Sequence, residues 1–145
     1  GKRDYNEKMQ IKLKNFIDRL LSDNYEFSNL DFREFNIEIL NSNSFVYADP
    51  PYLITCATYN EQDGWNESDE KDLLRFLDNL HGNDIKFALS NVLRSKGKEN
   101  KILIDWTNRN KDKYRVINLN YNYNNSNYQT KNKDFITEEV LIINY

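Results

Sequence analysis

The sequence predicts an α/β domain with a mostly parallel sheet and an antiparallel last strand. Short β-prone apolar runs alternate along the chain with stretches in which apolar residues recur at helical spacing. No internal repeat or linker divides the 145 residues, and this length suits one domain. Strand–helix alternation of this kind is typical of parallel sheets with helices on their faces.

The composition supports a folded domain and excludes several other classes. Aromatic residues reach 14% although 30% of the residues are charged and the mean hydropathy is −0.87, whereas disordered chains are poor in aromatics. The apolar runs are far shorter than the roughly 20 residues of a membrane span, and no leader is recognisable, so we expect a cytoplasmic protein. One Cys and one His predict no disulfide and no metal site. The net charge of −3 means that any contact with nucleic acid must use a local basic patch.

The first element is predicted to be a helix from Asn6 to about Ser22, which forms a leading segment (1–24) before an α/β core (25–145). Its apolar residues fall on one face: Met9, Leu13, Phe16, Ile17 and Leu20. Tyr25–Phe27 is expected to be a short strand, and a polar turn leads into Asp31–Glu34.

The next elements are a strand and a helix. Phe45–Ala48 is continuously apolar, as a strand covered on both faces should be, and it ends at Asp49. A helix capped by Asn66 or Ser68 should follow. We expect its buried side to consist of Leu73, Leu74, Phe76, Leu77 and Leu80, and its end to lie at His81–Asn83.

The remaining pattern adds three strands and one helix. A strand is expected over Ile85–Ser90, with Asn91 just beyond its end. A helix over Glu99–Asn108 should bury Ile102, Leu103 and Trp106. Strands follow at Tyr114–Leu119 and Val140–Ile143, with an irregular Asn/Tyr-rich stretch between them.

The tetrapeptide Asp49-Pro50-Pro51-Tyr52 is the main candidate site, because ligands of open α/β sheets bind beyond the carboxyl ends of strands. If the ligand is a flipped base with an exocyclic amine, such as adenine, Asp49 and the Pro50 carbonyl can each accept one of its N–H groups, and the carboxylate stabilises the positive charge that develops on the nitrogen. The two prolines fix the backbone around Asp49. Tyr52 offers a ring on which an extruded base can stack. The alternative is a simple strand terminator.

Several stretches resemble Dam-like DNA adenine-N6 methyltransferases. Asp49–Tyr52 followed by Ala57–Asn60 is similar to the catalytic region of that family, and Asn29–Glu34 is similar to the segment before it. Phe87–Asn91 resembles the strand that follows, and Thr137–Tyr145 the carboxyl terminus. The likeness runs from about Asp31 to Tyr145 and implies a partial Rossmann-like methyltransferase sheet.

The resemblance implies methyl transfer from S-adenosylmethionine to N6 of a flipped adenine in double-stranded DNA. Asp31 would accept a hydrogen bond from the adenine of the cofactor, with Phe32 beside that ring. Asp49 would lie close to both cofactor and target amine, and Ser90-Asn91 would shape the pocket floor. A helix cap at Asp31 and an ordinary turn at Ser90-Asn91 are the structural alternatives.

Two loops are candidate DNA-binding segments. Tyr59 and Asn60 would touch DNA or close over the base, with a surface turn as the alternative. The loop with Asn127, Tyr128, Lys131 and Lys133 combines cations for phosphates with a ring for stacking. Two basic clusters, at 94–101 and 109–115, are candidates for phosphate contacts or for solvated faces.

The chain departs from the family in one respect: a glycine-rich cofactor loop is not found among its four glycines, Gly1, Gly64, Gly82 and Gly97. We therefore interpret residues 1–145 as the carboxyl-terminal catalytic half of a methyltransferase that needs an amino-terminal half. Two other interpretations remain open. One is an N-methyltransferase acting on RNA or on protein glutamine. The other is a non-catalytic remnant that binds DNA or a protein partner.

Overall fold

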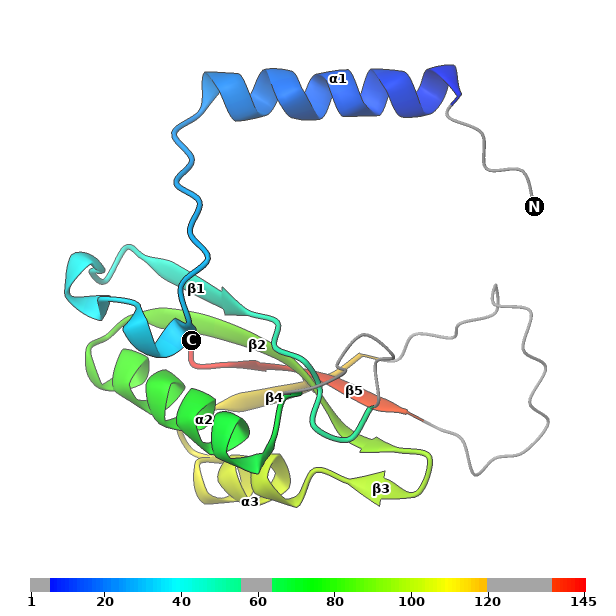
Figure 1. The fold of residues 1–145 in the computed structure, drawn as a ribbon. Coiled ribbons are helices and arrows are strands. Elements are labelled where there is room, and N and C mark those ends of the chain that lie inside the picture. Colours follow the sequence, from blue (N-terminus) through cyan, green and yellow to red (C-terminus); the bar gives the residue numbers. More distant parts are fainter. Residues whose placement is uncertain (1–5, 56–63, 120–136) are drawn as a thin grey trace. The chain divides into compact units, whose positions relative to one another are not determined.

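The computed structural model describes residues 6–55, 64–119 and 137–145, and the chain divides into two units, residues 1–31 and residues 32–145 (Figure 1). The first unit contains helix α1 (Glu7–Ser22), so the predicted leading helix is confirmed. The Asn6 side chain caps it by accepting a hydrogen bond from the backbone N–H of Met9. Within the described residues, no helix has the length and apolar character needed to cross a membrane.

The strand expected at Tyr25–Phe27 is not formed. These residues are irregular, and their two rings stack with centroids 6.3 Å apart. Alternating aromatic residues favour a strand, but a strand also needs a neighbour for its backbone hydrogen bonds, and Tyr25–Phe27 is paired with no described strand.

The second unit carries the α/β fold. Its elements in chain order are η1 (Phe32–Glu34), η2 (Ile37–Ile39), β1 (Phe45–Ala48), α2 (Glu67–Gly82), β2 (Lys86–Ser95), β3 (Lys98–Glu99), α3 (Lys101–Arg109), β4 (Arg115–Asn118) and β5 (Glu138–Ile143). The two 3₁₀ turns, η1 and η2, occupy a region in which the sequence indicated only a polar turn.

The strands form one mixed sheet in the order β1-β2-β5-β4, with the short β3 paired to β2. Strand β1 is parallel to β2, whereas β5 is antiparallel to both β2 and β4. Strands β1, β2 and β4 therefore run in one direction and the last strand runs against them. The predicted α/β class and the antiparallel last strand are confirmed.

Strand β1 corrects one expectation. Its residues alternate between exposed and half-buried, so it is not covered on both faces. Phe45 and Tyr47 are 53% and 57% exposed, while Val46 and Ala48 pack against the core. A continuous apolar run predicts burial on both faces only when both faces have packing partners, and the described packing of β1 on the core comes from one face.

Strand β2 extends five residues beyond the predicted end at Ser90 and reaches Ser95. Asn91 is therefore internal to the strand and almost completely buried. The strand continues because β5 pairs with it through this region and β3 folds back at its end. Lys96 and Gly97 form the connecting two-residue turn, and both have positive φ, of 49° and 75°. That conformation suits a tight hairpin and favours glycine.

Helices α2 and α3 begin at well-formed caps. Asn66 accepts hydrogen bonds from the backbone N–H groups of Ser68 and Asp69, and the Asp69 carboxylate accepts one from the Asn66 N–H. This reciprocal capping box confirms Asn66 as the cap of α2. Asn100 caps α3 in a similar way by accepting from the N–H of Leu103.

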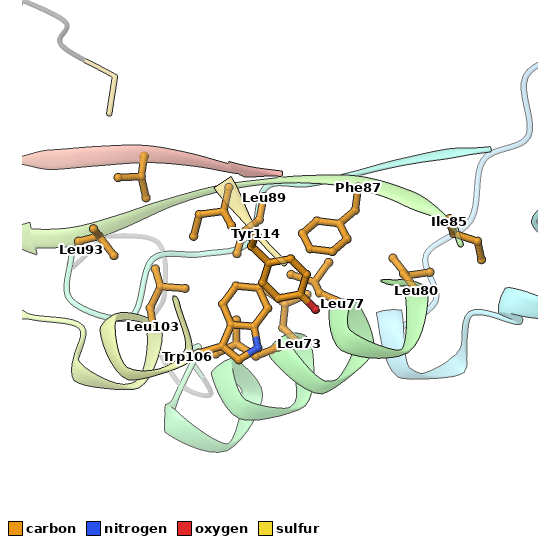
Figure 2. Close-up of a cluster of buried hydrophobic side chains, with 13 residues drawn as sticks. Leu73, Leu77, Leu80, Ile85, Phe87, Leu89, Leu93, Leu103, Trp106 and Tyr114 are labelled. Carbon is orange, nitrogen blue, oxygen red and sulfur yellow. The ribbon is translucent and has the colours of Figure 1, made fainter. Parts of the chain in front are cut away.

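The core lies between the sheet and these two helices (Figure 2). The predicted leucines of α2 supply much of it, and Phe76 packs at its margin. From the sheet and α3 come Phe87, Leu89, Leu103, Trp106 and Ile142, all nearly fully buried. Tyr114 fills the space between α2, α3 and Phe87, with ring centroids 4.7 Å from Trp106 and 5.3 Å from Phe87.

Candidate active site

Asp49 and Tyr52 come directly after β1, at the carboxyl end of a strand that runs parallel to its neighbour. Ala48 is in register with Leu89 of β2, so Asp49 and Ser90 are the next residues along the two strands. The Asp49 side chain is exposed, and the Tyr52 hydroxyl donates a hydrogen bond of 3.3 Å to its Oδ1. One step back, the Tyr47 and Ser90 hydroxyls are 2.7 Å apart. The end of β1 is therefore followed by a carboxylate and a phenol that are hydrogen-bonded to each other.

The surroundings of Tyr52 change the pKa of its phenol. Partial burial, reinforced by the nearby charge of Asp49 and the hydrogen bond to it, raises the pKa of Tyr52 to about 12. The phenol is consequently neutral at physiological pH and acts as a donor to the carboxylate. Tyr52 thus donates a long hydrogen bond to Asp49 while its side chain remains half-buried.

Phe32 lies in an aromatic cluster. Its ring centroid is 6.0 Å from that of Trp65 and 5.9 Å from that of Phe76, and the Arg33 guanidinium lies 4.6 Å from the ring centre. The Phe32 side chain is half-buried. Asp31 is exposed and immediately precedes this cluster in the sequence.

Two ion pairs attach η1 to α2. The Arg33 guanidinium binds Asp69 at 2.5 Å and Asp72 at 2.8 Å, and Asp72 also pairs with Arg75. The pKa of Asp69 is lowered by the Asn66 backbone N–H and by Arg33, and that of Asp72 chiefly by its hydrogen bond to Arg33. Exposed pairs contribute modestly to stability, but two carboxylates on one guanidinium fix the direction of the Phe32-Arg33 backbone.

Ser90 and Asn91, both expected to shape a pocket floor, point to opposite faces of β2, as neighbouring strand residues do. Ser90 lies beside Tyr47, near Asp49. Asn91 instead donates its amide to the buried carboxylate of Glu70 on α2 at 3.1 Å. The prediction that placed Asn91 beyond the strand end is wrong, because the strand continues to Ser95.

Glu70 and Trp65 are the residues that the sequence analysis missed. Glu70 is three and four residues before Leu73 and Leu74, so a charged residue lies on the buried face of α2. A carboxylate at such a position needs dedicated hydrogen-bond partners. A charged residue on the otherwise apolar face of a helix is the feature of the sequence that indicates such a buried, hydrogen-bonded carboxylate.

The predicted DNA-binding residues Tyr59, Asn60, Asn127, Tyr128, Lys131 and Lys133 lie outside the described residues. In the basic cluster at 94–101, Arg94 forms ion pairs with two carboxylates, Glu99 at 2.9 Å and Glu138 at 2.7 Å. These contacts raise the pKa of Arg94, chiefly through Glu138. They join β3 and β5 to the end of β2.

Comparison with known proteins shows the family to which this chain belongs. Residues 1–129 match the family model of D12 class N6 adenine-specific DNA methyltransferases, and the chain belongs to that family. The predicted resemblance is therefore confirmed at the family level.

The chain is similar in sequence to two modification methylases and a type II methyltransferase. The chain is 43% identical over 146 residues to modification methylase StsI of Streptococcus sanguinis, covering 97% of this chain and 22% of the relative. It is 38% identical over 141 residues to the type II methyltransferase M.FokI of Planomicrobium okeanokoites, covering 94% and 21%. With modification methylase LlaI of Lactococcus lactis subsp. lactis, the identity is 34% over 110 residues, covering 73% and 17%. The chain thus spans about a fifth of the length of these curated relatives.

Proposed function

We propose that this chain supplies the catalytic tetrapeptide of an enzyme that methylates adenine N6 in DNA. The observation that carries the proposal is the position of Asp49-Pro50-Pro51-Tyr52 at the carboxyl end of β1. There an exposed carboxylate receives a hydrogen bond from a neutral phenol. Membership of an adenine-specific DNA methyltransferase family makes adenine the substrate to be tested first.

The residues of this chain would act on the amine in three ways. Asp49 accepts one amine N–H and stabilises the positive charge that grows on nitrogen as it attacks. The Pro50 carbonyl accepts the second N–H, which turns the nitrogen lone pair toward the methyl donor. Tyr52 holds Asp49 by its hydroxyl and offers its ring to the flipped base.

S-adenosylmethionine, when bound, would supply the methyl group. We assign its adenine end to the half-buried ring of Phe32, which lies in an aromatic cluster, and the hydrogen bond to that adenine to Asp31. The methionine and ribose parts of the cofactor normally need a close approach of the backbone at a glycine-rich turn. The two described glycines do not form such a turn, because Gly82 ends α2 and Gly97 lies in the β2–β3 turn. We propose that an amino-terminal half supplies this turn. Calorimetry should then detect weak or no cofactor binding to residues 1–145 alone.

The DNA contacts are part of the same proposal. Tyr59 and Asn60 follow the tetrapeptide in sequence, and Asn127, Tyr128, Lys131 and Lys133 precede β5. We propose that these residues contact double-stranded DNA around the flipped adenine, with the lysines on phosphates. A modification methylase of this kind would work inside the cell.

The test is transfer of a radiolabelled methyl group to duplex DNA, by the chain alone and by the chain together with an amino-terminal half that carries a glycine-rich loop. We expect label at adenine N6 only with both halves. Duplexes without adenine are the matched control. Label on RNA or on protein glutamine instead would favour the alternative methyltransferase classes, and DNA binding without any label would favour a non-catalytic remnant.

A further inference from the structure

The carboxylate of Glu70 is completely buried and receives three hydrogen bonds. Its Oε2 accepts from the indole N–H of Trp65 at 2.6 Å. Its Oε1 accepts from the side-chain amides of Asn91 at 3.1 Å and Asn100 at 2.7 Å. One side chain in the first turns of α2 therefore joins the segment before α2, the middle of β2 and the cap of α3.

All three partners are donors, which suits a carboxylate because it only accepts. The two asparagines cannot reverse their amides without loss. The Asn91 Oδ1 already accepts from the N–H of Val92, and the Asn100 Oδ1 accepts from the N–H of Leu103. In a Glu70→Gln variant, the single side-chain oxygen would accept the hydrogen bonds of Asn91 and Asn100. The side-chain NH₂ would then face the Trp65 N–H, which would lose its acceptor. Glu70→Gln is thus a change that releases Trp65 selectively.

Trp65 connects two parts of the candidate site. The chain that leaves β1 through Asp49–Tyr52 returns to α2 directly after Trp65. The Trp65 ring packs against Phe32, the residue proposed to lie beside the adenine of the cofactor. Phe32 also touches Phe76 and is followed by Arg33, which is tied to α2. Fixing Trp65 against α2 therefore completes the wall that holds the Phe32 ring.

We propose that Glu70 is a positioning residue for cofactor binding: its carboxylate fixes the Trp65 indole, and Trp65 fixes Phe32. This inference rests on the proposed function for its cofactor. A buried carboxylate is costly to maintain, and packing alone would be served by another leucine at this position of α2. The presence of a carboxylate at position 70 is explained if cofactor binding depends on the orientation of the Trp65 ring.

The chain contains a matched control. Trp106 also donates its indole N–H to a carboxylate of α2, Asp78, at 3.1 Å and 3.2 Å, and its ring packs against Tyr114. Trp65→Phe and Trp106→Phe therefore each remove an indole N–H that donates to a carboxylate of α2. Because the chain has only these two tryptophans, the Trp106→Phe variant makes Trp65 the sole tryptophan emitter.

The first experiment follows Trp65 fluorescence in the Trp106→Phe background of this chain. Glu70→Gln should shift the emission to longer wavelength and increase quenching by acrylamide about twofold, since one charge-assisted bond is lost. Unchanged emission and quenching would overturn the inference whatever the protein methylates.

The second experiment measures S-adenosylmethionine binding and methylation in the two-half protein. Glu70→Gln and Trp65→Phe should each raise Kd and KM for the cofactor about tenfold and leave kcat within about twofold. Their double variant should be no worse than either single one, since both act on one bond. Trp106→Phe should leave both constants at the parent value.

The outcomes separate this inference from the proposed function. If the parent protein methylates adenine but Glu70→Gln keeps the parent cofactor affinity, Glu70 is only structural and the inference is wrong. An equal loss of affinity in Trp106→Phe would also contradict it. If the parent transfers no methyl group, the proposed function fails, and the fluorescence alone decides whether Glu70 fixes Trp65.

Discussion

At the scale of single residues, the side chains that follow β1 differ in their exposure and in their hydrogen bonds. Asp49 faces solvent and is available to a ligand, whereas Tyr52 is half-buried and hydrogen-bonded to it. The hydroxyl of Ser90 on β2 is hydrogen-bonded to the hydroxyl of Tyr47. Substitutions at Asp49 and Tyr52 should therefore have different effects on turnover and on base capture.

Asp49→Ala should lower turnover of the two-half enzyme about 100- to 1000-fold, since removal of one such electrostatic contact typically costs about 2.7–4 kcal/mol. Cofactor affinity should change little, because Asp31 and Phe32 are assigned to the cofactor. Asp49→Asn keeps an acceptor oxygen and should retain some activity. Single-turnover methylation alongside cofactor titration measures both effects. A parent rate in Asp49→Ala, or a loss confined to cofactor binding, would show that the assigned mechanism is wrong.

Tyr52→Phe should be mild, because it keeps the stacking ring and loses only a long hydrogen bond of 3.3 Å to Asp49. Tyr52→Ala should weaken capture of the flipped base, since stacking contributes roughly 1–3 kcal/mol per base. Binding of duplex DNA with a mismatched target adenine, measured by fluorescence anisotropy, compares the two variants. Equal losses in both would mean that the hydroxyl, and not the ring, is the important group.

At the scale of elements, the predictions succeeded where local chemistry decides the structure. The α2 helix followed from Asn66 and the leucine spacing, and α1 from Asn6 and its apolar face. They failed where distant partners decide: β2 continues past Asn91 because β5 pairs with it, and Tyr25–Phe27 has no paired strand. The tetrapeptide Asp49–Tyr52 was singled out from its residues alone, and its role stays a prediction. The link from Glu70 to Trp65 was not, because it depends on how α2 is seated on β2.

Tyr114, the residue before β4, is linked to helix α2 because its hydroxyl donates to Asp78 at 2.7 Å. Burial, followed by the Asp78 hydrogen bond and charge, raises the pKa of Tyr114 above its usual value of 10. A pKa raised by folding stabilises the native state below the unfolded pKa, and this stabilisation is lost as pH rises toward the folded value. Tyr114→Phe should lower stability at neutral pH by about 1 kcal/mol and flatten the decline in alkali.

Urea unfolding between neutral pH and about pH 11 measures this effect, with exposed Tyr145→Phe as the control. Tyr52, whose pKa is about 12, adds to the same alkaline decline, so the slope should be reduced and not abolished. A pH dependence identical to that of the parent would contradict the role assigned to Tyr114.

At the scale of the whole molecule, α2 and α3 cover one face of the sheet (Figure 1). Aromatic side chains of β1 are exposed. Phe45 packs edge-on against Tyr145, with centroids 6.0 Å apart, and both are more than half exposed, as is Tyr47. Contiguous exposed apolar surface of this kind promotes association.

The chain alone should therefore bind a hydrophobic dye and associate at high concentration. Adding the proposed amino-terminal half should lower the dye fluorescence if it docks near β1. Phe45→Ser should lower dye binding in the isolated chain, whereas Leu21→Ser on α1, also strongly exposed, controls for a general loss of apolar surface. Dye fluorescence and analytical ultracentrifugation measure the two effects. A chain that stays monomeric and binds no dye would contradict the assignment of this surface.

The position of β5 has a consequence for the order of assembly during synthesis. This strand lies between β2 and β4, although residues 138–143 are translated after every other described element. Until they leave the ribosome, β4 has none of its described strand partners, and one edge of β2 is unpaired. Pairings that distant in sequence form slowly. The sheet should therefore close late and in one step, and nascent chains that stop before residue 138 should remain open to proteases.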